Sequence, residues 1–395
     1  MARPAHELAD IFRQHGPRYR TARSLPLQQL RVMRAIEVCR TSALGGHAEK
    51  CGQCDYRRIA YNSCRNRHCP KCQNTERARW LDSRRGELLP VEYFHVVFTM
   101  PEQLARIAFY NKETVYGILF RSAAETLLTI ARDPKHLGAE IGFFGILHTW
   151  GQNLLHHPHI HFVVPGGGIG PDLEWIPCRR GFFLPVRVLS RLFRRLFLKA
   201  LREAFQRNQL QFFGEMESLK DEAAFREYLA PHENTQWVVY AKKPFGGPRQ
   251  ALGYLGRYTH RVALSNDRIL GVSGGQVTFQ WKDYRAKGKP GSRTMTVSSE
   301  EFIRRFLIHT LPPGFQRIRY FGFLTNRFRK EKLALCRKLL SNPATELLPS
   351  PAQRHETALP PAPMFHRCPR CQRGVLIRIA IVAGYRWPHR PPDSS

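Results

Sequence analysis

The feature that most constrains this chain is a short cysteine-rich block between residues 47 and 75. Within it, Cys51-Gly-Gln-Cys54 is followed, after fourteen residues, by Cys69-Pro-Lys-Cys72. Two such CxxC pairs can bring four thiolates to one tetrahedral zinc ion. A segment this polar offers no hydrophobic interior for four free thiols, so the spacing predicts one structural zinc held by these cysteines.

Three more side chains that could bind metal lie in the same block: Cys64, His68 and His47. They could form a second site, replace one of the four cysteines, or be ordinary side chains with other partners. Any such closed site would be structural, because metal binding folds a small segment that lacks a sufficient core.

The remaining five cysteines give weaker signals. Cys368 and Cys371 form a CxxC pair that supplies only two ligands, to which His366 could add a third. A basic tail that binds no metal is the competing interpretation. We expect the isolated cysteines to be ordinary core or surface residues: Cys39, Cys178 and Cys336.

The charge balance indicates a polyanionic partner. Lys and Arg number 62 against 31 acidic residues, a formal net charge of +31, while 43% of the residues are hydrophobic, enough for a core. Nucleic acid neutralises such a charge with release of counterions. An anionic membrane surface is the alternative, but we find no apolar run of about 18 residues and no signal sequence. We expect a cytoplasmic, nucleoid-associated protein that binds DNA and no membrane.

Two basic segments are candidate DNA contacts. The first is the cysteine block, with Arg65, Arg67 and Lys71. The second is a predicted amphipathic helix at 184–208, for which an ordinary surface helix is the alternative. Its candidate contacts to the DNA backbone are Arg194, Arg195 and Lys199.

Hydrophobic periodicity predicts a mixed chain of helices and strands. Helices are expected at 1–45, 102–132, 184–208 and about 249–264, and strands at 92–101, 141–152, 159–164 and 235–245. A β-hairpin is expected at 269–284, with Ser273-Gly274-Gly275 as its turn. Residues 341–364, rich in Pro, Ser and Ala, indicate a linker.

The predicted strand at 159–164 carries an alternating pair of histidines. Side chains on a strand alternate between faces, so His159 and His161 point the same way. Ile160, Phe162 and Val164 then point to the other face, toward a core. Two imidazoles on one sheet face can hold a divalent ion. An alternating histidine pair on a half-exposed strand can also be without function. A functional interpretation therefore needs a second motif as its partner.

That partner is the segment ALGYLGRYTHRVALSN, in which Tyr254 and Tyr258 are four residues apart. On a helix both hydroxyls would lie on one face. A packed aromatic stripe is the alternative. However, Arg257 and Arg261 lie close to that face, which suits phosphate binding better than a core.

Together these parts suggest cleavage of DNA. A divalent metal at His159 and His161 would polarise a scissile phosphate. A tyrosine oxygen would attack and become joined to the DNA 5′-phosphate. The bond energy is retained, so a free 3′-OH can reverse the step, and a second tyrosine allows a second cleavage.

These motifs resemble a known family. HPHIHFVV looks like the histidine–hydrophobic–histidine motif of HUH endonucleases, and YLGRYTHRVALSN is similar to the two-tyrosine motif of IS91-family transposases. CGQCDYRRIAYNSCRNRHCPKCQ resembles the zinc-binding region of that family, and residues 301–324 look like its C-terminal block. The resemblance covers about residues 10–325, with the motifs in the family's order.

The resemblance implies rolling-circle transposition on single-stranded DNA at transposon ends and on target DNA. It implies an α+β fold, an HUH-type antiparallel sheet flanked by helices and preceded by a small cysteine-rich zinc-binding domain. His159 and His161 would bind Mg²⁺ or Mn²⁺, and Tyr254 and Tyr258 would be the nucleophiles. The corresponding domain prediction is an N-terminal helical segment 1–45, a zinc-binding DNA-contact domain 46–90, a catalytic domain 91–325 and a basic Pro-rich tail 326–395.

A third ligand of the catalytic metal is expected in this family. The candidates of suitable residue type are His260, Asn266, His148 and Gln152. On a regular helix His260 would project away from the face of Tyr258, which makes His260 a weaker candidate for the third ligand.

Three other functions remain as alternatives. A rolling-circle replication initiator or relaxase would use the same chemistry. A non-catalytic zinc-dependent DNA-binding regulator would explain the charge and the cysteines but not the His and Tyr motifs. A metallohydrolase with activated water needs more ligands, and the nearest acids downstream are Asp172 and Glu174.

Overall fold

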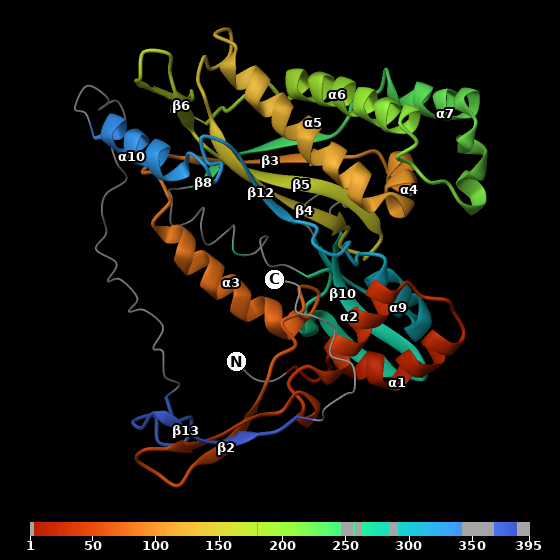
Figure 1. The fold of residues 1–395 in the computed structure, drawn as a ribbon, viewed down its shortest axis with the longest axis vertical. Helices are drawn as coiled ribbons and strands as arrows, with labels where there is room; N and C mark the ends of the chain where they lie inside the picture. Colours follow the sequence, from red (N-terminus) through yellow and green to blue (C-terminus); the bar gives the residue numbers. More distant parts are fainter. Residues whose placement is uncertain are drawn as a thin grey trace.

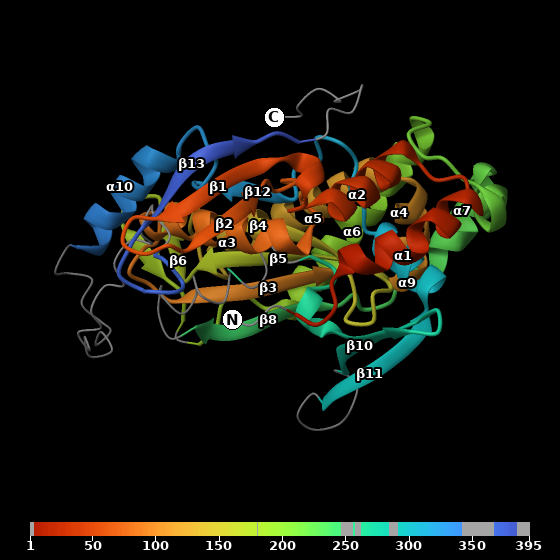
Figure 2. The ribbon, with the colours of Figure 1, turned by 90° about the horizontal axis from the view of Figure 1, so that it is seen from below.

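Helices and antiparallel sheets form the structure, a computed structural model that describes residues 4–179, 181–245, 256, 262–283, 291–341 and 367–384. Every strand pairing among these residues is antiparallel. Figures 1 and 2 show a large sheet covered by long helices, with two three-stranded sheets beside and below it. The predicted α+β class, with antiparallel sheets and a cysteine-rich N-terminal region, is confirmed.

The central sheet has five strands in the order β12-β4-β5-β3-β8. Their bounds are Ile318–Gly322, Gly142–Trp150, His156–Pro165, Tyr93–Thr99 and Val239–Phe245 in that order. β4 and β5 are consecutive in the chain and pair as a hairpin, with Ile146 opposite His161 and His148 opposite His159. This register fixes which side chains of the two strands share a face.

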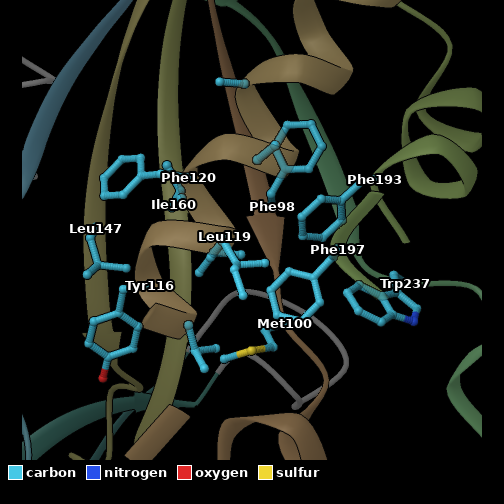
Figure 3. Packing of buried hydrophobic residues seen from close by; sticks show 14 of the residues in the cluster. Phe98, Met100, Tyr116, Leu119, Phe120, Leu147, Ile160, Phe193, Phe197 and Trp237 are labelled. Atoms are coloured by element: carbon cyan, nitrogen blue, oxygen red, sulfur yellow. The ribbon is translucent and has the colours of Figure 1, made fainter. Parts of the chain in front are cut away.

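One face of this sheet is buried under helices (Figure 1). These are α4 (Glu102–Tyr110), α5 (Lys112–Arg132), α6 (Val186–Gln206) and α7 (Glu222–Leu229). Figure 3 shows Phe98 and Ile160 from the sheet packed with Leu119 of α5 and with Phe193 and Phe197 of α6. The predicted inward face of the histidine strand is confirmed, because its alternate apolar residues Ile160, Phe162 and Val164 all lie in this core.

The predicted helix at 102–132 is two helices that meet at Asn111. The backbone of Asn111 leaves the helical region, with φ −120° and ψ 46°. Its side-chain amide donates to the carbonyls of Ile107 and Gln211 and accepts from the amide of Gln211. Asparagine competes in this way for backbone groups that a continuous helix would use.

The opposite face of the sheet lies toward α3 (Pro70–Arg85), which begins just after Cys69 and contacts the sheet through Trp80. Pro70 occupies the first turn, where its missing N–H costs no helical hydrogen bond. Trp80 of α3 packs edge-on against Phe144 of β4, with ring centroids 5.7 Å apart. Phe144 shares its sheet face with His148, so α3 and the histidines lie on the same side.

A second core joins the N-terminal helices to a later part of the chain (lower right of Figure 1). It contains α1 (Leu8–Thr21), α2 (Leu27–Val38) and α9 (Ser299–Leu307), packed on a sheet of β9 (Ile269–Ser273), β10 (Gln276–Asp283) and β11 (Gly291–Ser298).

The predicted hairpin at 269–284 is confirmed as the pair β9–β10. Its turn has positive φ at Gly274 and Gly275, +54° and +73°, as a tight two-residue turn requires.

The third sheet brings distant parts of the chain together (Figures 1 and 2). Its order is β13-β1-β2, with bounds Leu376–Val382, Gly46–Cys51 and Arg57–Tyr61. The remaining strands and the last helix are β6 (Gly167–Ile169), β7 (Trp175–Pro177) and α10 (Arg329–Leu340). The predicted linker at 341–364 lies outside the described residues except for Ser341. The boundaries of the four predicted domains stay a prediction.

We predict that Phe162→Ala lowers the free energy of unfolding by about 3–5 kcal/mol, because it leaves a cavity in a closely packed core. Phe162 is fully buried and contacts the rings of Phe98, Phe143 and Phe321. Urea denaturation followed by circular dichroism measures the loss. Phe182→Ala is the control, because Phe182 is 49% exposed, and its effect should stay within about 0.5 kcal/mol. Equal effects of the two variants would contradict the assigned core.

Candidate metal centres and DNA-contacting residues

Three histidines gather on the face of the central sheet that lies toward α3. His148 from β4 and His159 and His161 from β5 each offer a ring nitrogen, and these atoms lie within 4.8 Å of one another. His148 and His161 are buried and His159 is half-buried. The β4–β5 register produces this arrangement, because it sets His148 directly opposite His159.

Hydrogen bonds orient two of the three rings. Nδ1 of His159 donates to the carbonyl of His157 over 2.6 Å, which leaves Nε2 as the ring nitrogen that could bind a metal. Nδ1 of His161 lies 2.7 Å from Nε2 of His95 on β3. Burial, with the nearby Lys242, lowers the pKa of His95 to about 4, so this ring is neutral at physiological pH. If Nδ1–H of His161 donates to His95, Nε2 of His161 becomes the ligand atom.

The donor set of this cluster fits a divalent metal. Three imidazoles that converge on one point are a common ligand arrangement. The group contains no carboxylate among the described residues. Asp172 and Glu174, the nearest acids downstream of the histidines in the sequence, are not part of it, so the extra acidic ligands of a metallohydrolase are missing from this group.

Of the four candidates for a third ligand, only His148 is brought to the histidine pair within the described residues. The side-chain oxygen of Asn266 accepts a hydrogen bond from the amide of Leu8. The carbonyl of Gln152 accepts from Arg268. His260 lies outside the described residues. The sequence held a usable signal, since pairing the predicted strands 141–152 and 159–164 as a hairpin puts His148 near His159. For His95 the only signal was its place on the predicted strand 92–101.

The predicted nucleophiles Tyr254 and Tyr258, with Arg257 and Arg261, lie outside the described residues. Gly256, between the tyrosines, is described and buried. It lies so close to α3 that a Cβ atom on it would be 2.5 Å from Cδ1 of Leu81. The middle of the two-tyrosine segment therefore touches the helix beside the histidine face.

Four cysteines form the first cysteine cluster: Cys39, Cys64, Cys69 and Cys72. Sulfur–sulfur distances of 3.6, 3.5 and 3.5 Å join Cys39 to Cys72, Cys69 to Cys39 and Cys64 to Cys72. Sulfurs about 2.3 Å from a tetrahedral zinc lie about 3.8 Å apart, so the cluster has the size of a zinc site. Cys64 belongs to it, as one of the sequence alternatives proposed. The expectation that Cys39 is an ordinary residue is wrong, because the end of α2 carries it to the cluster.

The two CxxC pairs of the block are not brought to one point. Cys69 and Cys72 belong to the first cluster, whereas Cys51 and Cys54 lie with Cys368 and Cys371 in a second cysteine cluster. The predicted single site of four is therefore wrong in its grouping. Linear spacing does not predict this grouping, because Cys69 and Cys72 meet Cys64 of the same block and Cys39, just after α2, whereas Cys51 and Cys54 meet a pair more than 300 residues away.

The histidines of the block are in neither cluster. Nε2 of His68 accepts a long hydrogen bond from the amide of Leu311, and burial lowers the pKa of His68 to about 3. Nε2 of His47 is 2.9 Å from the carboxylate of Glu49. Both residues therefore have other partners, and the suggestion of His68 as a zinc ligand is not supported.

The predicted DNA-contacting side chains differ in their availability. Arg65 and Arg195 are exposed. The other four described candidates have partners within the chain: Arg67 donates to the carbonyl of Phe315, Lys71 pairs with Glu7, Arg194 donates to the carbonyl of Thr235, and the exposed Lys199 pairs with Glu203. α6, which carries Arg194 and Arg195, packs on the sheet face opposite the histidines. Their role in DNA binding stays a prediction.

A cysteine cluster with the dimensions of a zinc site, a histidine cluster on an antiparallel sheet and a strongly basic chain are typical of metal-binding proteins that act on nucleic acid. Family comparisons identify the class. Residues 11–100 match the family described as "Transposase zinc-binding domain", and residues 142–332 match the family described as "Putative transposase".

A protein of Sinorhizobium fredii named "Putative transposase y4qJ" is 58% identical over 402 residues, covering all of both chains. The "Transposase for insertion sequence element IS801" of Pseudomonas savastanoi pv. phaseolicola is 29% identical over 295 residues, 73% of this chain and 68% of the relative. The chain belongs to the IS91-family transposases. No solved structure matches it. Among the described residues, no helix has the length and apolar character needed to cross a membrane.

We predict that His148→Ala weakens Mn²⁺ binding at the histidine cluster by about 10- to 100-fold, because one of three imidazole ligands is removed. Isothermal titration of the zinc-loaded protein with Mn²⁺ measures this. His136→Ala, which changes an exposed histidine in the loop after α5, is the matched control and should leave the affinity unchanged. Unaltered Mn²⁺ affinity in His148→Ala would exclude His148 as a ligand.

Proposed function

We propose that this transposase is a metal-dependent single-strand DNA endonuclease and strand transferase of the HUH type, which moves its element by rolling-circle transposition. The observation that carries the proposal is a contact between the helix beside the histidine face and Gly256, the residue midway between the two tyrosines. His148, His159 and His161 lie on one face of the sheet, and Gly256 touches the helix beside that face. Tyr254 and Tyr258 are each two residues from Gly256, within about 7 Å along the chain.

The proposed reaction joins the protein to the 5′ side of the break. A tyrosine oxygen attacks the scissile phosphorus in line, and its phenolic proton passes to a base or to solvent. The bond between phosphorus and the 3′ oxygen breaks, and that oxygen takes up a proton. The products are a 5′-phosphotyrosine and a free 3′-OH, so a later attack by a 3′-OH can rejoin DNA without another energy source.

The histidine cluster would hold the catalytic ion. A bound divalent metal withdraws charge from the phosphate and stabilises the charge that develops on it. We propose Mg²⁺ or Mn²⁺, and the three imidazoles favour Mn²⁺, because Mg²⁺ prefers oxygen ligands. His95 would act as a positioning residue, since it contacts Nδ1 of His161 over 2.7 Å and fixes the orientation of that ring.

The first cysteine cluster supports a structural zinc rather than a catalytic one. Four cysteines complete a tetrahedral set and leave no open position for a substrate. Cys69 and Cys72 flank the first turn of α3, and Cys39 follows α2, so the zinc would join these two helices. Because α3 also lies against Gly256, the zinc would stabilise the helix that contacts the residue midway between the two tyrosines.

We expect Tyr254→Phe/Tyr258→Phe to abolish a covalent protein–DNA complex that the wild type forms with Mn²⁺. The substrate is single-stranded DNA carrying the element's end, and the complex is detected on a denaturing gel. A 3′ label should become attached to the protein, whereas a 5′ label should be released on a fragment with a 3′-OH. The single variants show which tyrosine acts first.

Tyr110→Phe, at a tyrosine that is 43% exposed on α4, is the control and should leave the complex intact. Attachment of the 5′ label would contradict the proposed polarity. If no covalent band forms although the wild type binds the DNA, the non-catalytic DNA-binding regulator becomes the better interpretation. A replication initiator or relaxase would give the same band, and mobilisation of a marked element in cells separates these functions from transposition.

We expect Arg195→Ala/Lys199→Ala to reduce the salt dependence of single-stranded DNA binding. Both side chains are exposed on α6. Each lost phosphate contact should lower the slope of log K against log salt by about 0.7. Fluorescence anisotropy between low and physiological salt measures the slope. Lys135→Ala, at an exposed lysine in a loop, is the control. An unchanged slope in the double variant would make α6 an ordinary surface helix.

A further inference from the structure

We propose that the second cysteine cluster is a second zinc site, which fastens residues 367–384 to the N-terminal hairpin. Its ligands are Cys51, Cys54, Cys368 and Cys371, whose sulfurs all lie within 4.8 Å of one another. The matched zinc-binding region ends at residue 100, so half of this site lies far outside it. The inference rests on geometry alone and does not depend on the DNA-cleaving activity.

The distances within the second cluster are those of a metal site. Sulfur–sulfur distances are 3.7 Å between Cys51 and Cys371 and 3.6 Å between Cys54 and Cys368. A disulfide would need about 2.05 Å, and all four cysteines are free. Four sulfurs about 2.3 Å from a tetrahedral zinc lie about 3.8 Å apart, close to the observed spacing.

The backbone around the cysteines is shaped for thiolate ligands. The amide of Gln53 donates to Sγ of Cys51, and the amide of Gly374 donates to Sγ of Cys371. Hydrogen bonds from backbone amides stabilise the charged form of an acceptor. Gly374 is also required sterically, because a Cβ atom there would lie 2.3 Å from Sγ of Cys51.

Apolar packing in this part of the chain is too small to hold it without a metal. Its buried core consists of Cys51, Cys368 and Leu376 alone. The apolar side chains of β13 point largely into solvent, since Ile377, Ile379 and Ile381 are 56%, 53% and 84% exposed. A unit with so little core needs a metal or another cross-link to fold.

The proposed zinc would therefore complete a three-stranded sheet from two separate parts of the chain. β13 pairs with β1 from Gly46–Val382 to Cys51–Leu376, so the last pair of the ladder includes a ligand, Cys51. The two clusters share no cysteine, which makes two zinc ions per chain the expected content of the cysteine clusters. Cys178 and Cys336 belong to neither cluster and provide matched controls.

The first test is the zinc content of the purified full-length protein, measured by plasma mass spectrometry. In a His159→Ala/His161→Ala background, where the histidine cluster cannot hold zinc, we expect two zinc ions per chain with all cysteines present and one after adding Cys368→Ser/Cys371→Ser. In the same background Cys178→Ser should retain two. Cys39→Ser/Cys72→Ser should lose only the ion of the first cluster. One zinc ion with all cysteines present, or two after adding Cys368→Ser/Cys371→Ser, would overturn the proposal.

Cobalt provides a second measurement that needs no variant. The apoprotein should take up two equivalents of Co²⁺ with the visible absorption of tetrahedral thiolate sites, and zinc should displace both. Saturation after one equivalent would contradict the second site whether or not any cysteine variant folds. Because neither measurement uses DNA, their outcome is separate from the success or failure of the proposed cleavage reaction.

The fastening role has its own test. A specific protease site is inserted between Pro351 and Ala352 of the full chain, and the zinc-loaded protein is cut there. We expect the C-terminal fragment to remain bound in gel filtration and to separate after the metal is removed with a chelator. Separation with zinc present, or persistent binding after its removal, would show that zinc does not hold this segment.

Discussion

The pairing register of β4 and β5 is the constraint on which the candidate active site depends. With His148 opposite His159 and Ile146 opposite His161, three imidazoles converge on one face while Ile160 supports the core on the other. A shift by one residue would exchange the two faces and bury the histidines under α5 and α6. The aromatic core on the helical side thus fixes the position of the metal ligands, because it tolerates only one register.

The sequence was most informative where the pattern involved residues close together in the chain. The alternation around His159 predicted both the strand and its inward face, and the two glycines of the β9–β10 turn predicted the hairpin. The cysteines were more difficult, because CxxC pairs contain six of the eight clustered cysteines but reveal neither Cys39 and Cys64 nor the grouping. Cys39 reaches its cluster through the packing of α2, and Cys371 reaches its partner Cys51 across 320 residues. His95 shows the same limit, since only the sheet order places it beside His161.

α3 connects the first cysteine cluster to the sheet that carries the histidine cluster. This helix begins between two cysteines, packs Trp80 onto the sheet and touches Gly256 with Leu81. Local propensity predicts nothing about these contacts, and α3 was not among the helices expected from periodicity. Its surface is mostly polar, so its place depends on contacts at its ends and on a few apolar side chains. A structural metal at one end of such a helix would fix its direction with few packing contacts.

The meeting of β1 and β13 has a consequence for synthesis of the protein. During translation the hairpin of β1 and β2 emerges long before its third strand, residues 376–382. Until then β1 has an open edge with unpaired backbone groups, which is a template for pairing with other chains. A product that ends prematurely, or a gene fragment lacking this region, keeps that edge permanently. Completion of the sheet therefore distinguishes molecules that contain β13 from those that lack it, which would be prone to aggregation and degradation.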